Sequence, residues 1–247
     1  DGEKPVVMGA RPIGNFTAHE GAILKADVAA QGFKGIAFRQ LVFAGRRQPV
    51  ARYPNFDPEN PYGGGWTYVA GEEKPMYADV PGEDRRTVRY KPEDDRAWSR
   101  PEEAEVFIFP RYNWWNRIEK IAAYDPQTRT ITLAKNMQYA ARPEDRYCIM
   151  GMREELDAPG EWFQDVENQK LYLIPPAGAD LTKDVMTVPT VNAIVEFRKT
   201  HHVRVRGLEL SCAEQCALRF SDCDDALVEK CSIHDLGYFQ GAAISLD

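Results

Sequence analysis

The stretch IVEFR (Ile194–Arg198) recurs twice further along the chain, as ALRFS (Ala217–Ser221) and as AISLD (Ala243–Asp247). Each copy alternates apolar and polar residues with a period of two, which is the pattern of a β-strand with one buried face. The first two copies are 23 residues apart. A short strand that returns at an interval of this size indicates a repeat architecture.

Two further strands lie between the first two copies and keep the same spacing. VRV (Val203–Val205) reappears 23 residues later as ALV (Ala226–Val228), and LEL (Leu208–Leu210) reappears as CSI (Cys231–Ile233). Three short strands cannot bury their inward side chains within one repeat, so successive repeats must stack, with parallel strands about 4.8 Å apart. The LxxLxLxxN line of leucine-rich repeats is absent. The sequence therefore predicts a right-handed parallel β-helix, which is a solenoid.

The chain before these repeats does not follow the 23-residue spacing. Residues 1–36 contain short strands between turns and are expected to form the first rung of the β-helix. Residues 37–176 contain hairpins, such as the two strands on either side of the turn at Asp125, and predict an inserted antiparallel β-sandwich domain. Residues 177–247 are expected to form the remaining coils. The predicted fold class is all-β.

Composition excludes some partners and leaves others open. The chain has 31 Lys and Arg against 38 Asp and Glu, a formal net charge of −7, which argues against a nucleic-acid partner. No apolar run approaches the ~18 residues of a membrane span, so no membrane span is expected. No signal peptide opens the chain, and both ends fall inside patterned segments. We therefore expect a fragment of a longer protein.

Four stretches of the predicted insertion are similar to segments of known proteins: Val50–Asp57, Phe107–Trp115, Glu155–Trp162 and Lys170–Pro176. Together they resemble the inserted β-sandwich of secreted bacterial β-helix proteins that degrade glycans, in particular glycoside hydrolase family 141. The resemblance implies a fucosidase- or xylanase-like enzyme that acts on plant cell-wall polysaccharide by a two-carboxylate mechanism. It also implies a secreted, periplasmic or cell-surface location, and main catalytic acids on coils beyond residue 247.

The candidate site lies where the repeat has its longest and most variable turns, which usually border binding sites. Glu209 and His234 occupy outward positions on the strand that precedes this turn, and Asp235 follows in the loop. We take these three as candidate catalytic residues, because His titrates near neutrality and a carboxylate beside it can orient the ring. Tyr238 and Gln240 are candidate substrate-binding residues. The alternative for His234 is a purely structural hydrogen bond to the turn.

No metal or other cofactor is expected. Asp222, Asp224 and Asp225 share one turn and suggest calcium, but such acidic clusters usually face solvent. The pair Cys212 and Cys216 lacks the spacing and the accompanying histidines of a structural zinc site. A disulfide among the turn cysteines remains open, because pairing depends on compartment and geometry.

Tryptophan faces stack on sugar rings, which draws attention to the adjacent Trp114 and Trp115. Adjacent residues of a strand point to opposite faces. We therefore expect one of the two in the core and the other at a contact between sandwich and β-helix.

Two further functions remain open beside hydrolysis. A polysaccharide lyase on the same scaffold would use a Lys or Arg base, usually with calcium, and would release unsaturated products that absorb in the ultraviolet. A non-catalytic glycan-binding protein would bind a polysaccharide or oligosaccharide without turnover. In each case the expected partner is a carbohydrate.

Overall fold

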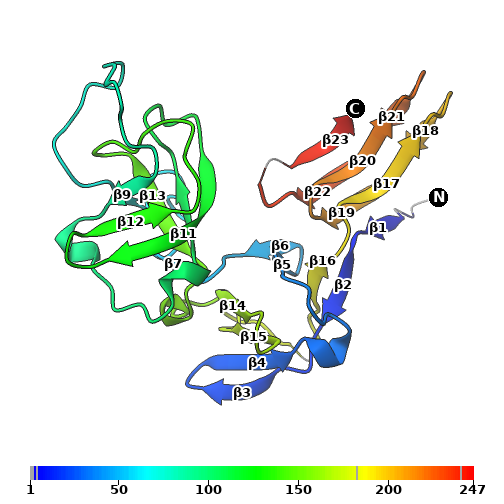
Figure 1. The fold of residues 1–247 in the computed structure, drawn as a ribbon. Helices are drawn as coiled ribbons and strands as arrows, with labels where there is room; N and C mark the ends of the chain where they lie inside the picture. The colour runs from blue at the N-terminus through cyan, green and yellow to red at the C-terminus, as the bar shows by residue number, and fades with distance from the viewer. Residues whose placement is uncertain (1–2, 4, 182, 240) are drawn as a thin grey trace. The chain divides into compact units, whose positions relative to one another are not determined.

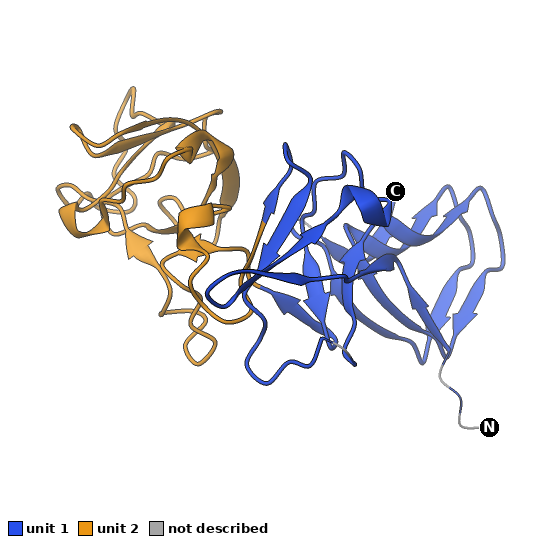
Figure 2. Ribbon diagram, turned by 90° about the horizontal axis from the view of Figure 1, so that it is seen from below, with its two compact units in different colours: residues 1–48, 164–247 blue, residues 49–163 orange. Residues whose placement is uncertain are grey.

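The computed structural model describes residues 3, 5–181, 183–239 and 241–247, and it divides into two compact units. Unit 1 comprises residues 1–48 and 164–247, and unit 2 comprises residues 49–163 (Figure 2). Both units consist of strands and loops, as the predicted all-β class requires. Helical structure in the described residues is limited to single 3-10 turns: η1 (Ala29–Gln31), η2 (Pro92–Asp94), η3 (Pro101–Glu103) and η4 (Arg153–Glu155).

The repeats of unit 1 pair as parallel strands. In Figure 1 the strands β17, β20 and β23 run side by side from yellow to red. The predicted spacing is confirmed where it can be read from the register: Val205 pairs with Val228 and Leu210 with Ile233, each 23 residues on. The parallel sheets are β17 (Ala193–Arg198), β20 (Cys216–Ser221) and β23 (Ala242–Leu246); β1 (Val6–Met8), β19 (Glu209–Ala213) and β22 (Ser232–Leu236); and β18 (Arg204–Arg206) with β21 (Leu227–Glu229).

The corners of the repeat have the same backbone conformation in successive copies. Within the described residues of the repeats (193–239 and 241–247), four pairs of residues at the 23-residue spacing have positive φ angles, in the left-handed region. These pairs are Lys199 and Asp222, His202 and Asp225, Gly207 and Lys230, and Cys212 and Asp235. A single residue in the left-handed conformation bends the chain sharply, so each pair marks a corner that the repeat uses twice. Period-two strands and left-handed corners together set the length of one turn.

One corner contains glycine in one copy and lysine in the next, which allows a test of backbone strain. Gly207 has φ +70°, and a Cβ built on it would meet nothing within 4 Å. Gly207→Ala is therefore expected to destabilise unit 1 by about 1 kcal/mol through conformation alone. Lys230→Gly, at φ 56°, is expected to have a neutral to mildly stabilising effect. Chemical denaturation of both variants checks this, and equal destabilisation by the two substitutions would contradict it.

The inward side chains of the repeat form columns. Phe197 of β17 stacks on Phe220 of β20 with ring centroids 4.9 Å apart and an interplanar angle of 14°. Phe220 in turn pairs in register with Leu246 of β23. Leu210 and Leu218 are fully buried in the same apolar cluster. Each strand therefore buries its apolar face against the equivalent strand of the neighbouring repeat.

Antiparallel sheets make up the rest of unit 1. The first has the order β2 (Ala10–Ile13), β16 (Met186–Pro189), β5 (Leu41–Phe43) and β6 (Arg46–Gln48), and the second has the order β14 (Trp162–Asp165), β15 (Lys170–Leu173), β4 (Ile23–Asp27) and β3 (Thr17–Glu20). Within the described part of residues 1–36, where a first rung was expected, parallel pairing is confined to β1, which pairs with β19. The strands that follow it pair antiparallel.

Unit 2, all of whose residues are described, is narrower than the expected insertion at 37–176 and is not a pair of separate sheets. Its strands form one continuous antiparallel path in the order β7 (Arg52–Tyr53), β13 (Arg146–Met150), β10 (Glu105–Ile108), β11 (Arg117–Asp125), β12 (Thr130–Leu133) and β9 (Thr87–Arg89), and β8 (Thr67–Tyr68) also pairs with β13. The long strand β11 explains the difference. Its first half, Arg117–Lys120, pairs with β10, and its second half pairs with β12 from Ile121 onward, with a shift of register between Ile121 and Ala123. One strand thus joins the strands around β10 to the strands around β12.

Candidate active site

Glu209, His234 and Asp235 lie on two neighbouring parallel strands of unit 1. In the register of β19 and β22, Ser211 pairs with His234 and Glu209 with Ser232, so Glu209 and His234 are diagonal neighbours on one face. Asp235 is the left-handed corner residue of its repeat, with φ 53°. This corner turns the Asp235 side chain back toward His234, although the two residues are adjacent in sequence. The structure thus brings the three predicted catalytic residues together.

The imidazole of His234 lies between the two carboxylates. Its Nδ1 is 2.8 Å from Oδ2 of Asp235, and its Nε2 is 3.2 Å from Oε1 of Glu209. The hydrogen bond with Asp235 is the main cause that raises the pKa of His234 above its usual value; burial opposes this shift, and the hydrogen bond with Glu209 adds to it. When protonated, the ring donates to both carboxylates at once. The group is therefore a carboxylate–imidazole–carboxylate arrangement in which both carboxylates favour the protonated ring.

The bridge connects both carboxylates to a single ring, so each is one hydrogen bond away from His234. The side chains of Glu209, His234 and Asp235 are all partly accessible to solvent. A proton can therefore pass between either carboxyl group and the imidazole, and between these groups and a bound molecule.

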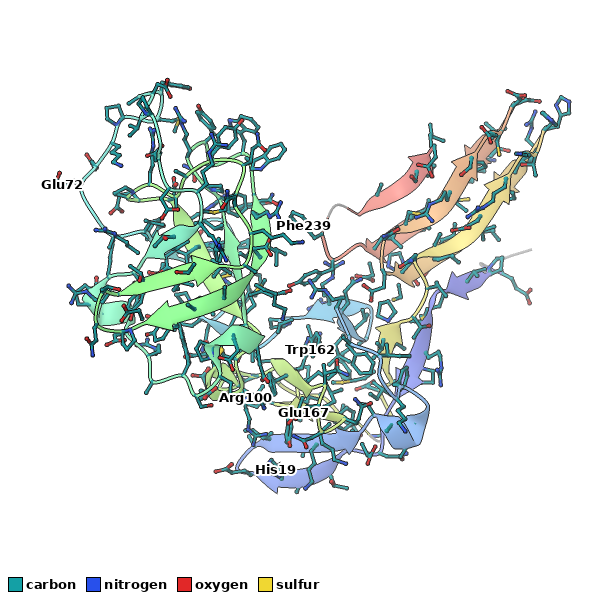
Figure 3. All side chains as sticks on the ribbon, viewed as in Figure 1. His19, Glu72, Arg100, Trp162, Glu167 and Phe239 are labelled. Carbon is teal, nitrogen blue, oxygen red and sulfur yellow. The ribbon has the colours of Figure 1, made fainter. Side chains whose placement is uncertain are left out.

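A cavity of about 370 Å³ lies within unit 1 and includes the predicted substrate-binding residue Tyr238 in its lining. Arg39 lies over the Tyr238 ring, 4.4 Å from its centroid. Glu214 also lines the cavity, and burial raises the pKa of its carboxyl. Figure 3 shows Phe239, another lining residue, on the connection between β22 and β23. Gln240, the other predicted binding residue, lies outside the described residues.

Arg47 lies near carboxylates of both the cavity and the imidazole-bridged group. Its side chain is on the exposed face of β6, and its guanidinium donates to the main-chain oxygen of Leu236 at 3.1 Å. The nearby carboxylates of Asp235 and Glu214 favour its charged form. One cation at the protein surface therefore lies close to a carboxylate of each group.

The repeat pattern gave no signal for Arg39 or Arg47. Both come from the segment around residue 40, and Arg47 contacts a residue 189 positions away. Contacts of that range leave no trace in local periodicity. Glu214 lies in the turn Cys212–Gln215, one of the long, variable turns at which the sequence predicted the site. The position of that turn could therefore have drawn attention to Glu214, although the residue itself is part of no motif.

The acidic turn that suggested calcium has partners of its own. Asp225 accepts from Arg204 at 3.0 Å and contacts Nδ1 of His202 at 2.6 Å, and Asp224 lies 3.1 Å from Nδ1 of His201. Among the described residues, no group of three or more His, Cys, Asp or Glu side chains has the geometry to hold a metal ion. All five cysteines, each in the described part of the chain, are free thiols. No described helix is both long and apolar enough to cross a membrane.

Comparisons with known proteins give a fold and no family. No family model matches the chain, and no curated protein matches it. A solved structure described as "Glycoside hydrolase" is similar to it, with a TM-score of 0.69 and 17% sequence identity. The similarity covers 96% of this chain and 49% of that one, so the chain spans about half the length of the structure it matches. The chain therefore has a fold like that of part of a glycoside hydrolase.

Proposed function

We propose that this chain contributes a substrate cleft to a glycoside hydrolase, and that its parallel repeats are coils of a right-handed β-helix. The observation that carries the proposal is the bridge from Glu209 through His234 to Asp235, which gives two carboxyl groups and a titratable ring in one hydrogen-bonded group. The same unit has a cavity lined by aromatic, amide and charged side chains, the kind of lining that binds small polar ligands such as sugars. The similarity to a glycoside hydrolase fold supports the same conclusion.

The proposed chemistry divides one proton transfer between two carboxyl groups. In inverting hydrolysis one carboxylic acid protonates the leaving oxygen, while the other carboxylate accepts a proton from the attacking water. The first group has then lost one proton and the second has gained one. The imidazole of His234 can accept the proton from the second group on one nitrogen and donate from its other nitrogen to the first, which restores both groups. The carboxylates raise the pKa of His234, so this relay is expected to weaken as the pH rises through that pKa.

The proposal concerns the full-length protein, which we expect to be secreted, periplasmic or at the cell surface and to act on fucosylated or xylan-type plant polysaccharides. The resemblance to family 141 supports this substrate class. The same resemblance implies main catalytic acids on coils beyond residue 247. Glu209 and Asp235 would then act at the near edge of the same cleft, because equivalent positions in successive coils are about 4.8 Å apart.

Conservative changes at the two carboxylates test the proposal. Glu209→Gln and Asp235→Asn in the full-length protein are each expected to lower kcat/KM on the hydrolysed glycan by about 10²-fold, because each removes a proton donor or acceptor. Glu196→Gln is the matched control, since Glu196 is a carboxylate on a different sheet that pairs with Arg219 at 2.7 Å. Its activity should match that of the wild type.

The stereochemistry of the product gives an independent readout. Proton NMR of fresh hydrolysate should show inversion at the anomeric carbon. Retention, or full activity in both carboxylate variants, would refute the proposed role of the bridge. Unsaturated products would identify a lyase, and binding without turnover would identify a glycan-binding protein.

A further inference from the structure

Five aromatic rings gather on loops of unit 2 and form what we term the aromatic platform. Its members come from the loop before β9, the loop between β10 and β11, and the loop between β12 and β13. They are Tyr77, Tyr112, Trp114, Trp115 and Tyr139. Tyr112 is central, with its ring centroid 6.0 Å from that of Tyr77, 5.7 Å from Trp114 and 4.9 Å from Tyr139.

The outer rings of the platform face solvent. Tyr77 is 82% exposed, Trp114 67% and Trp115 40%. The expectation that one of the two tryptophans lies in the core is therefore wrong. Strand alternation does not apply to them, because both precede the first residue of β11, Arg117. A group of exposed aromatic rings is unusual on a protein surface and indicates a binding function.

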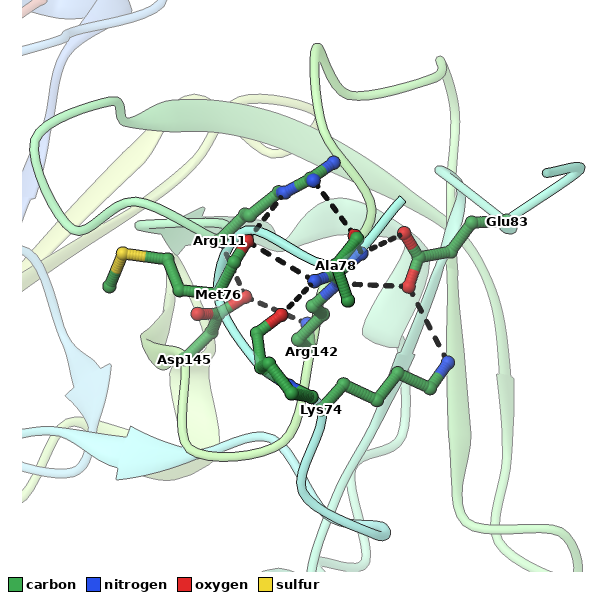
Figure 4. Close-up of polar contacts among 8 residues, drawn as sticks. Lys74, Met76, Ala78, Glu83, Arg111, Arg142 and Asp145 are labelled. Atoms are coloured by element: carbon green, nitrogen blue, oxygen red, sulfur yellow. Dashed lines mark hydrogen bonds and ion pairs between the residues drawn. The ribbon is translucent and has the colours of Figure 1, made fainter. Parts of the chain in front are cut away.

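Buried polar contacts hold these loops in place (Figure 4). The Asp145 carboxylate accepts from the main-chain N–H groups of Arg111 and Arg142, each at 2.7 Å. The guanidinium groups of Arg111 and Arg142 each donate to the main-chain oxygens of Met76 and Ala78, at distances from 2.7 to 3.2 Å.

These contacts fix the chain next to two rings of the platform. Met76 and Ala78 are the residues before and after Tyr77. Arg111 is the residue before Tyr112, and its guanidinium lies 5.0 Å from the centroid of the Tyr112 ring. The exposed rings are therefore positioned before any ligand arrives, which lowers the entropy lost on binding.

The size of the exposed surface limits what it can bind. With about 150–250 Å² for each aromatic side chain, the open parts of the three outer rings amount to roughly 400 Å². A stable protein–protein interface needs about 800 Å² on each partner, so a second protein would be poorly held by these rings alone. An area of roughly 400 Å² suits a short segment of a chain ligand, such as a few sugar rings.

The chemistry of the platform favours a neutral sugar ring. The faces of aromatic rings carry partial negative charge and attract polarised C–H groups, such as those on one face of a pyranose. Tyrosine hydroxyls and indole N–H groups at the edges can bond to sugar hydroxyls. The two arginines beneath donate to main-chain oxygens, and the chain's net charge of −7 disfavours a polyanion.

We propose that the aromatic platform of unit 2 is a non-catalytic binding site for the pyranose rings of a neutral polysaccharide. This proposal does not depend on catalysis at Glu209 and Asp235. The platform would be a second carbohydrate-binding site on the chain. A long polymer could occupy both sites and bind more tightly, whereas a short substrate would bind at the first site alone.

Titration with soluble neutral polysaccharides tests the proposal. Full-length wild-type protein is titrated with arabinoxylan and with xyloglucan, and binding is followed by calorimetry and by tryptophan fluorescence, to which Trp114 and Trp115 of the platform contribute. Saturable binding is expected, and Trp114→Ala should weaken it about tenfold by removing a stacking face. Tyr77→Ala should also weaken it. Tyr62→Ala is the matched control, since Tyr62 is equally exposed in the same unit and should leave the affinity unchanged.

Three further outcomes decide between this site and its alternatives. Turnover of a small aryl glycoside by the full-length protein should be unaffected by Trp114→Ala, so loss of platform binding is distinguishable from failure of the proposed hydrolase. Equal affinity in wild type and Trp114→Ala, or no saturable binding to either polysaccharide, would overturn the proposal. Self-association in sedimentation velocity that Trp114→Ala abolishes would assign the surface to a second copy and overturn it as well.

Discussion

Replacing Arg142 with methionine is expected to lower the free energy of unfolding of unit 2 by about 3–5 kcal/mol. The Arg142 side chain is almost wholly buried and donates to both carboxylate oxygens of Glu83, at 3.0 and 2.9 Å. It also donates to the main-chain oxygens of Pro75, Met76 and Ala78. Methionine fills much of the space of the aliphatic part of the arginine side chain. It leaves the three main-chain oxygens and the largely buried Glu83 carboxylate without the hydrogen bonds that Arg142 donates.

Urea unfolding followed by tryptophan fluorescence reports mainly on unit 2, because four of the five tryptophans lie well within residues 49–163 and only Trp162 is on β14, the strand at the boundary. Lys91→Met is the matched control. It removes a cation from an ion pair with Glu144 at 3.4 Å, which is more exposed to solvent, so it should change stability by less than about 1 kcal/mol. An Arg142→Met effect no larger than that of Lys91→Met would contradict the assigned role. The Arg142 variant should also weaken polysaccharide binding, since Arg142 fixes the loop of Tyr77.

The same ion pair has a pH signature. The hydrogen bond from Arg142 holds the pKa of Glu83 below its usual value, in spite of opposing burial. A carboxyl with a lowered folded-state pKa stabilises the protein above its unfolded pKa of about 4.3, and the contribution is lost as the pH falls through the folded value. The acid-induced loss of stability of unit 2 should therefore be less steep in Arg142→Met than in the wild type.

Replacing Phe220 with alanine is expected to destabilise the parallel repeats of unit 1 by about 3–5 kcal/mol. The Phe220 side chain is 4% exposed and stacks on Phe197, so its loss removes apolar burial and leaves a cavity between two repeats. Repeats that contact only their neighbours cannot compensate from elsewhere. Hydrogen exchange of β17 and β20 amides should therefore become faster in this variant.

The next residue of the same column supplies the control. Leu246 pairs in register with Phe220 but is 79% exposed. Leu246→Ala should therefore change stability by less than about 0.5 kcal/mol. The tryptophan-detected transition of unit 2 should be the same in both variants. Comparable loss in the two variants, or protection of β20 unchanged in Phe220→Ala, would show that the column does not stabilise the repeat.

Local pattern was enough to predict the strands and their spacing. Val205 pairs with Val228 because each strand alternates inward and outward residues and each corner uses one left-handed residue. These are properties of a few adjacent residues, so they are readable in the sequence. Glu209 and His234 were found for the same reason, since their outward direction follows from strand period.

Long-range contact was not readable in the sequence. Tyr77, Tyr112 and Tyr139 meet through loops anchored by Asp145 and Arg142, whose sequence neighbours show no period. Arg47 reaches Leu236 across 189 positions. That β11 pairs with β10 along its first half and with β12 along its second half likewise depends on partners distant in the sequence.

The sequence by itself determined that this is an all-β chain with a 23-residue parallel repeat, and it identified the three residues that now form a carboxylate–imidazole–carboxylate bridge. Only the tertiary structure decided that His234 bonds to both carboxylates, that a cavity with Arg39 and Glu214 includes Tyr238, and that Trp114 and Trp115 face solvent. The physical reason is that side-chain direction along a strand follows from its local period, whereas contacts between loops depend on where distant segments of the chain are packed.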